Sequence, residues 1–293
     1  MTRNGLNDEA QPIRLYDYET VFGSAQKENF PESFTLSRKA SIKNQGSTSA
    51  CCACAIATAA EYIWEKEMSQ GWNYGKFRDN SRPGLFLIRA LELWRKIGTV
   101  PLADFGVLCE VPEIKELADK HSELILEAQK YRISGYASIN YAKADKKDTA
   151  IKEALTNGKI VLIAAIPKYF KEPHAVVIDG WNDKSGVYTI QNSWGDTWGS
   201  GGYGEVPKSE VGDVYAVTFE EIRLPFTDVP EERWSYGAIK NMYLSGLMNG
   251  RNSDVFDPGA PVSREELAAV LDRLTKRFDE RLERVYSIIC DLR

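Results

Sequence analysis

Residues 44–64 read NQGSTSACCACAIATAAEYIW, and this stretch organises the rest of the chain. Its first half is small, polar and contains glycine, which is typical of a loop. Its second half is rich in alanine and indicates a buried helix. Cys51 stands where the loop becomes the helix. Because the free N–H groups and the dipole of a helix N-terminus stabilise an anion, a thiol there should ionise more readily than a free thiol, and the thiolate is the nucleophilic form.

A thiol nucleophile needs a base within reach and a third group that orients the base. The sequence contains only two histidines. His121 lies in the predicted helix 113–131, where we expect it to face solvent. His174 opens the apolar, β-branched run 174–181, which predicts a buried strand with a half-enclosed histidine at its mouth. His174 is therefore the better candidate base.

A second predicted strand, 187–191, follows the polar turn 183–186. Two short strands joined by such a turn indicate a hairpin, which would bring Asn192 back beside His174. An amide there can accept a hydrogen bond from one imidazole nitrogen and leave the other nitrogen facing Cys51. The sequence therefore predicts a Cys-His-Asn arrangement.

These motifs resemble those of the papain-like cysteine peptidases. The resemblance rests on Gln45-Gly46-Ser47 with Cys51, on His174 before a strand, and on Asn192-Ser193-Trp194-Gly195. It spans roughly residues 30–224 and is weakest in the middle. Three separated motifs in the right order make a chance match improbable. The resemblance implies an α+β, papain-like fold, with a helical half, an antiparallel β half and a cleft between them, and the predicted order of helices first and strands later agrees with it.

By this resemblance, Cys51 attacks the carbonyl of a peptide bond, His174 transfers the proton and Asn192 holds the imidazole. Trp194 would shield the contact between His174 and Asn192 from water. Gln45 would donate its side-chain amide to the oxyanion, together with the Cys51 N–H. No metal or other cofactor is expected, because no cluster of histidines or acidic ligands accompanies the thiols.

The chain departs from the family's pattern beside the nucleophile. Thr48 replaces a cysteine, so we expect the disulfide that normally pins this loop to be absent, and Cys52 replaces an aromatic residue. Cys51 and Cys54 also form a C-x-x-C pair, which can signal redox chemistry. A loop rather than a βαβ unit surrounds the pair, so a redox role is a minor alternative to Cys54 being a buried small side chain.

Residues 226–274 resemble an S-layer homology motif. The sequence predicts a helix, a glycine-rich loop and a second helix, with Ser263 as N-cap and Glu266 completing a capping box. In such modules, three matched residues help to bind anionic cell-wall polysaccharide. Here they are Trp234, Gly250 and Arg264. The alternative is a plain helical hairpin that packs on the preceding domain.

Only one copy of this motif is present, whereas wall-anchoring modules usually need three. An apolar seam follows it at steps of three and four residues, which is close to a heptad repeat. Its members are Leu267, Leu271, Leu274, Phe278, Leu282, Val285 and Ile289. The seam favours association of chains, for example as trimers that assemble three motifs. A helix folded back on its own domain is an equal alternative.

The expected domains are an N-terminal arm (1–29), a peptidase domain (30–224), a single S-layer-like motif (225–274) and a C-terminal helix (275–293). The arm is expected to lie on the catalytic domain, or else to occupy the substrate cleft. A net charge of −5 argues against a nucleic-acid partner. The chain has no continuous apolar stretch of about 18 residues, so we expect no membrane span. No signal peptide is evident, which predicts retention in the cytoplasm, or a place in the cell envelope if the protein is released or exported by a non-standard route.

The sequence thus favours a cysteine endopeptidase that hydrolyses protein or peptide substrates, with a module for secondary cell-wall polysaccharide. The resemblances suggest a Gram-positive bacterium or one of its phages as the source. One alternative is a hydrolase that cuts the cross-linking peptides of the cell wall. Another is a non-catalytic wall-binding or structural protein with a degenerate site.

Overall fold

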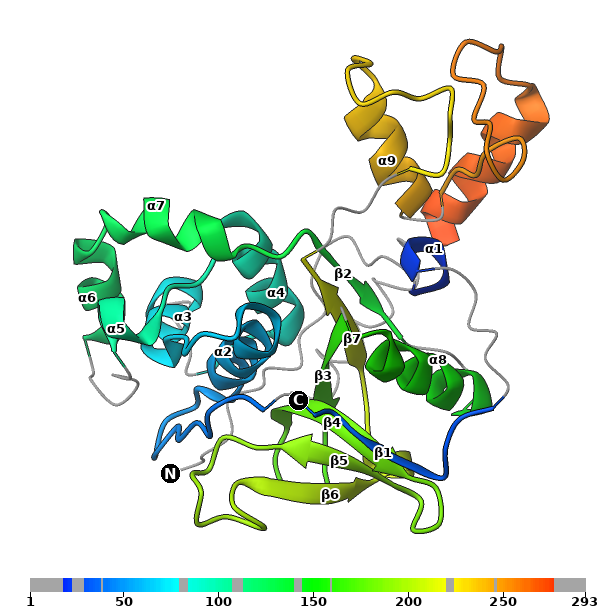
Figure 1. Ribbon diagram of the computed structural model, residues 1–293. Coiled ribbons are helices and arrows are strands. Elements are labelled where there is room, and N and C mark those ends of the chain that lie inside the picture. Colours follow the sequence, from blue (N-terminus) through cyan, green and yellow to red (C-terminus); the bar gives the residue numbers. More distant parts are fainter. Residues whose placement is uncertain are drawn as a thin grey trace, which may run out of the picture. The chain divides into compact units, whose positions relative to one another are not determined.

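The computed structural model describes residues 18–22, 29–37, 39–78, 84–106, 113–139, 144–158, 160–219, 224–244 and 247–276. The chain forms two units (Figure 1). The larger unit comprises Met1–Asp8 and Ala25–Glu221, and the smaller comprises Glu9–Ser24 and Ile222–Arg293.

An antiparallel sheet forms one half of the larger unit. Its strands are β1 (Ser33–Thr35), β2 (Gly135–Ser138), β3 (Ile160–Ile166), β4 (His174–Asn182), β5 (Val187–Gln191), β6 (Tyr203–Pro207) and β7 (Val214–Thr218). They are ordered β2-β7-β3-β4-β5-β6, and β1 pairs with β4. β3 and β4 are almost entirely buried, as their continuous apolar sequences predict. The predicted hairpin is confirmed, because β4 pairs with β5.

Helices form the other half. They are α2 (Cys51–Trp64), α3 (Gln70–Phe77), α4 (Leu87–Lys96), α5 (Leu102–Phe105), α6 (Ile114–Lys120), α7 (Leu124–Ala128) and a 3-10 turn at Gln129–Tyr131. A further helix, α8 (Ala144–Asn157), packs on β3 and β4 (Figure 1). Residues Cys51 to Ile63 of α2 are all buried, and α2 contacts both α3 and β4. The small alanine side chains let this helix lie close to its neighbours on every side.

The predicted helix 113–131 is interrupted. α6 ends at Lys120, and His121 adopts a non-helical backbone conformation as its C-cap. His121 Nδ1 lies 2.7 Å from a carboxylate oxygen of Glu123, and both side chains are substantially exposed. His121 is therefore a surface residue, as its charged surroundings predict.

The smaller unit contains α1 (Tyr18–Phe22), α9 (Tyr236–Leu244) and a helix at 264–276. Its core contains Phe226, Val229 and Ile239. The predicted capping box is confirmed, because Glu266 N–H donates to Ser263 Oγ at 3.0 Å and Ser263 N–H donates to a Glu266 carboxylate oxygen at 2.7 Å. α1 contacts α9. This part of the N-terminal arm therefore packs within the smaller unit.

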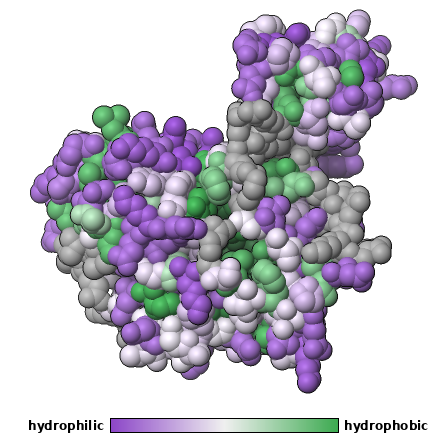
Figure 2. All heavy atoms as spheres, in the orientation of Figure 1, coloured by the Kyte–Doolittle hydropathy of each residue, from purple (hydrophilic) through white to green (hydrophobic). Residues whose placement is uncertain are grey.

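The helix at 264–276 exposes the start of the apolar seam. Leu267, Leu271 and Leu274 are 47%, 51% and 37% exposed. On the face shown in Figure 2, the smaller unit is mostly hydrophilic, with apolar residues showing between the charged ones. The rest of the seam, Phe278, Leu282, Val285 and Ile289, lies outside the described residues. Association through the seam stays a prediction.

Within the described ranges, the search for a helix long and apolar enough to span a bilayer finds none. The same part of the chain holds no group of three or more His, Cys, Asp or Glu residues placed to bind a metal ion.

Candidate active site

Cys51 is the first residue of α2, and no side chain caps the helix before it. The first-turn N–H groups are therefore not satisfied by a capping side chain, and they favour negative charge at this position. Cys51, Cys52 and Cys54 are all buried, and none of them forms a disulfide.

His174 is the first residue of β4, and Asn192 directly follows β5. His174 Nε2 and Asn192 Oδ1 are 2.6 Å apart. His174 Nδ1 is buried and has no hydrogen-bond partner among the described residues, so this atom is not committed to another group of the site. The hairpin register accounts for the pairing, because Gln191 lies opposite Val177, three residues from the start of β4.

The surroundings of Cys51 favour its thiolate. Burial acts most strongly and opposes ionisation. Hydrogen bonds with the side chains of Cys52 and His174, the charge of His174 and the Ala175 N–H together outweigh burial, so the pKa of Cys51 lies well below its usual value. In contrast, burial and the neighbouring Cys51 and Cys54 raise the pKa of Cys52. Of these two adjacent thiols, Cys51 is therefore the one that ionises.

The loop before Cys51 is joined to the loop that carries Asn192. Gln45 N–H donates to Ser193 O at 2.9 Å, and Ser193 Oγ donates to Gln45 Oε1 at 2.8 Å. Gln45 Nε2 donates to Thr48 O at 2.7 Å. The structure therefore places the Gln45 amide in the nucleophile loop, with one N–H directed at a neighbouring carbonyl. Gly195 N–H also donates to Lys43 O at 3.0 Å, with Gly195 at φ +81°, a conformation that favours glycine.

Aromatic rings enclose His174. The Trp194 ring lies over the imidazole, with centroids 4.7 Å apart and planes at 31°. The Phe170 ring meets the imidazole edge-on at 5.4 Å. Trp198 packs on Trp194 at 5.6 Å. The sequence predicts a half-enclosed histidine, but His174 is fully buried. The sequence motif around His174 does not indicate that Phe170, from the turn before β4, also packs on the imidazole.

Cys52 links α2 to the chain segment at Leu85. Its thiol lies 3.2 Å from Leu85 O, and its single proton can be donated either to this carbonyl or to the Cys51 thiolate. This contact ties the residue after the nucleophile to the segment that leads into α4. Cys52 therefore provides a small hydrogen-bonding group at the position where papain-like peptidases have a large aromatic ring.

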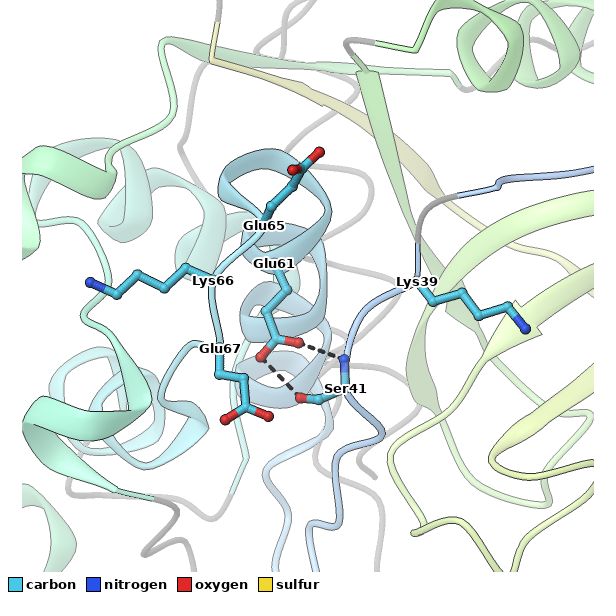
Figure 3. Close-up of a pocket in the computed structure, with 6 residues that line it drawn as sticks. All are labelled: Lys39, Ser41, Glu61, Glu65, Lys66 and Glu67. Carbon is cyan, nitrogen blue, oxygen red and sulfur yellow. Dashed lines mark hydrogen bonds between the residues drawn. The ribbon is translucent and has the colours of Figure 1, made fainter.

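A buried ion pair anchors the other end of α2. Glu61 and Lys43 are paired, and their side chains are 4% and 3% exposed. Figure 3 shows Glu61 directed at Ser41, whose backbone N–H and hydroxyl both donate to the Glu61 carboxylate. The pocket in this view is also lined by Lys39, Glu65, Lys66 and Glu67. It lies ten or more residues along α2 from Cys51 and does not contain the thiol.

Comparisons with known proteins show what each part of the chain is similar to. Residues 163–218 match the model of the papain family cysteine proteases, and residues 225–268 match the S-layer homology domain. The larger unit also resembles solved cysteine proteases. The chain has a papain-like fold. It resembles the papain family in sequence and carries an S-layer homology motif after the papain-like unit.

Two solved structures and one curated relative illustrate the likeness. Xylellain, a cysteine protease from Xylella fastidiosa, has a TM-score of 0.60 at 17% identity, over 75% of this chain and 97% of xylellain. The proform of the ragweed cysteine protease Amb a 11 has a TM-score of 0.53 at 18% identity, over 70% of each chain. A cysteine protease of Blomia tropicalis is 23% identical over 216 residues. That match covers 61% of this chain and 62% of the relative's length.

The S-layer-type residues do not all gather in one place. A pocket in the smaller unit is lined by residues of the loop 248–262 and of the following helix, including Gly250, Arg251 and Arg273. Trp234 is 92% exposed, and neither it nor Arg264 is among the lining residues. A Cβ on Gly250 would lie 2.3 Å from the Phe226 ring, so this position requires glycine.

Proposed function

We propose that the papain-like unit is a cysteine endopeptidase that uses Cys51, His174 and Asn192. The observation that carries this proposal is the 2.6 Å contact between His174 Nε2 and Asn192 Oδ1, beside a thiol whose pKa is lowered at a helix N-terminus. A nucleophile, a base and an orienting amide are the parts that nucleophilic acyl transfer requires. The papain-family match supports peptide bonds as the class of substrate.

The reaction proceeds in two steps. The Cys51 thiolate attacks the carbonyl carbon and forms a C–S bond. As the C–N bond breaks, the His174 imidazolium gives its proton to the departing amine, which leaves a thioester. His174 then takes a proton from water as the water attacks the thioester, and the C–S bond breaks to release the acid and restore the Cys51 thiolate beside the His174 imidazolium.

Two side chains would assist without changing covalently. Asn192 would keep Nε2 of His174 engaged, which directs the other ring nitrogen to Cys51. Gln45, with the Cys51 N–H, would stabilise the oxyanion, and losing one such donor costs on the order of 10²–10³ in rate in other enzymes. One N–H of the Gln45 amide donates to Thr48 O, so the oxyanion would be bound either by the second N–H or after that hydrogen bond is exchanged.

A thiol-directed epoxide and a quenched-peptide library test the proposal together. The epoxide should label the protein, Cys51→Ala should abolish both labelling and cleavage, and Cys54→Ala should retain both as the matched control. Labelling that persists in Cys51→Ala would refute the assignment of the nucleophile. Labelling without cleavage of any library peptide, but with release of fragments from purified cell wall, would favour a wall-peptide hydrolase. Absence of both activities would favour a degenerate, non-catalytic site.

We also propose that the smaller unit binds an anionic secondary cell-wall polysaccharide. The S-layer homology match supports this second role. The pocket adds Arg273, beside an Arg251 that is already paired with Asp257 and Glu266 of the same pocket. Co-sedimentation with purified wall material is the test. If the polysaccharide binds in the pocket, Arg273→Gln should weaken binding. If it binds at the S-layer motif residue Arg264 instead, Arg264→Gln should weaken binding. Binding that neither substitution weakens would contradict the proposal.

One motif would be weak by itself, so we propose that chains assemble through the seam that begins at Leu267, Leu271 and Leu274. Their exposure supports this proposal, since apolar side chains at this spacing on a helix normally have a partner. Sedimentation at micromolar concentration should reveal trimers, and Leu271→Glu should dissociate them. A strict monomer would contradict the proposal.

A further inference from the structure

The turn between β3 and β4 brings two lysines next to the candidate active site. It spans only residues 167–173 and leads directly into His174, the first residue of β4. Lys171 N–H donates to Lys168 O at 2.8 Å, which defines a β-turn. The first and last Cα atoms of such a turn lie within about 7 Å, so the two lysines are neighbours. Lys171 has φ +70°, a conformation that few residues other than glycine adopt.

The turn is held against the imidazole by Phe170. Its ring packs edge-on to His174 at 5.4 Å and to Trp194 at 5.1 Å. Lys168, Tyr169 and Lys171 point outward, because the two lysines are exposed and Tyr169 is 45% exposed, whereas Pro167, Glu172 and Pro173 are half-buried. One inward ring therefore fixes two outward ammonium groups close to the reacting centre.

The chemistry of the proposed reaction identifies which part of the substrate would lie near the turn at residues 167–173. The imidazolium must give its proton to the departing amine, so the leaving peptide lies on the His174 side of the thiol. The acyl part stays bonded to Cys51, on the side of α2. Residues C-terminal to the cleaved bond would therefore pass the half-buried Trp194 and Trp198, whose rings both pack on Phe170 of the turn.

We propose that Lys168 and Lys171 bind a carboxylate on the leaving part of the substrate. Neither lysine forms an ion pair with another described residue, so both charges are available to a ligand. Two carboxylates lie near the lysines. Asp196 is exposed on the loop between Trp194 and Trp198, and Glu172 is half-buried in the turn itself and already has an interaction of its own, so the two lysines are the charged groups of the turn that are exposed. The inference rests on the proposed peptidase function and names its substrate class. These are peptides with an acidic side chain, or a free C-terminal carboxylate, one or two residues beyond the cleaved bond.

Quenched peptides with one fixed acyl side test this inference. The second residue after the bond is Glu, Gln or Lys, and a short series ends at that residue as a free acid or as an amide. Two exposed ion pairs predict a preference for Glu over Gln in kcat/KM of about threefold to thirtyfold, which decreases as ionic strength rises. The double variant Lys168→Gln/Lys171→Gln should lose this preference and still cleave the Gln peptide. The control Lys184→Gln changes an exposed lysine in the β4–β5 turn, about 25–30 Å along β4 from His174, and should keep the preference.

Each outcome bears on a separate claim. Preference for the free acid over the amide would assign the carboxylate to a chain terminus, and preference for Glu in the amidated series would assign it to a side chain. Equal rates for Glu and Lys, or a preference that survives in the double variant and at high salt, would overturn the inference while the peptidase function stands. Failure to cleave any peptide would overturn both. Thermal unfolding of the double variant checks that the two substitutions in the turn have not destabilised the papain-like unit.

Discussion

Replacing Glu61 with glutamine should destabilise the papain-like unit strongly, although the two side chains are nearly the same size. The Glu61 carboxylate accepts hydrogen bonds from Ser41 N–H at 2.6 Å, from Ser41 Oγ at 3.1 Å and from Met68 N–H at 2.8 Å, and it pairs with Lys43. Glutamine offers one acceptor oxygen for these donors and turns an N–H₂ group towards some of them. The Lys43 ammonium would then remain buried without a counter-charge.

Removing one partner of a buried pair typically costs about 3–5 kcal/mol, and each donor left unsatisfied adds about 1–3 kcal/mol. Relaxation of Ser41 and entry of water reduce this total, so we expect the free energy of unfolding to decrease by about 3–5 kcal/mol. The double variant Lys43→Met/Glu61→Leu removes both charges and should recover much of the loss. Urea unfolding of the full chain, followed by tryptophan fluorescence, measures the difference. The exposed ion-pair variant Lys130→Gln is the control and should change stability by less than about 1 kcal/mol.

Two results would refute this reasoning. A loss below about 1 kcal/mol in Glu61→Gln would mean that the pair is solvated in solution. A double variant less stable than Glu61→Gln would mean that the loss comes from packing rather than from an unpaired charge.

Three further predictions concern the site and the module. Cys52→Ala removes a hydrogen bond that favours the Cys51 thiolate, so the pKa of Cys51 should rise and the pH profile of alkylation should move to higher pH; an unmoved profile would contradict this. Asn192→Ala should lower kcat/KM about tenfold or more through loss of the 2.6 Å contact to His174, measured on the best library peptide, and an unchanged rate would remove Asn192 from the mechanism. Gly250→Ala should destabilise the smaller unit by about 1–3 kcal/mol and weaken its binding to wall material, because the added Cβ meets a ring at 2.3 Å; wild-type thermal stability would contradict the crowding.

The fold and the positions of the main candidate site residues follow from local patterns. The loop-to-helix transition at Cys51, the strand opening at His174 and the hairpin ahead of Asn192 each depend on residues within about a dozen positions. Strand pairing then fixes the contact between His174 and Asn192. The α+β order and the capping box are predictable for the same reason.

The features that the sequence does not reveal depend on long-range contacts. Ser193 holds Gln45 across 148 positions, and no local pattern indicates that pairing. The full burial of His174 comes from Phe170, which only the short β3–β4 turn brings close. The grouping of α1 with the smaller unit joins segments more than 200 positions apart, so hydrophobic periodicity alone cannot predict it.

The hydrogen bonds that join residues 43–45 to residues 193–195 have a practical consequence. They are made largely by main-chain atoms, and they connect the segment that presents the sulfur to the segment that follows the carboxamide. Two separate polypeptides, divided between α7 and β2, would each contain only part of the catalytic machinery. Their reassembly should restore hydrolysis, which makes this scaffold suitable for a split reporter in which turnover signals that two fused proteins have met.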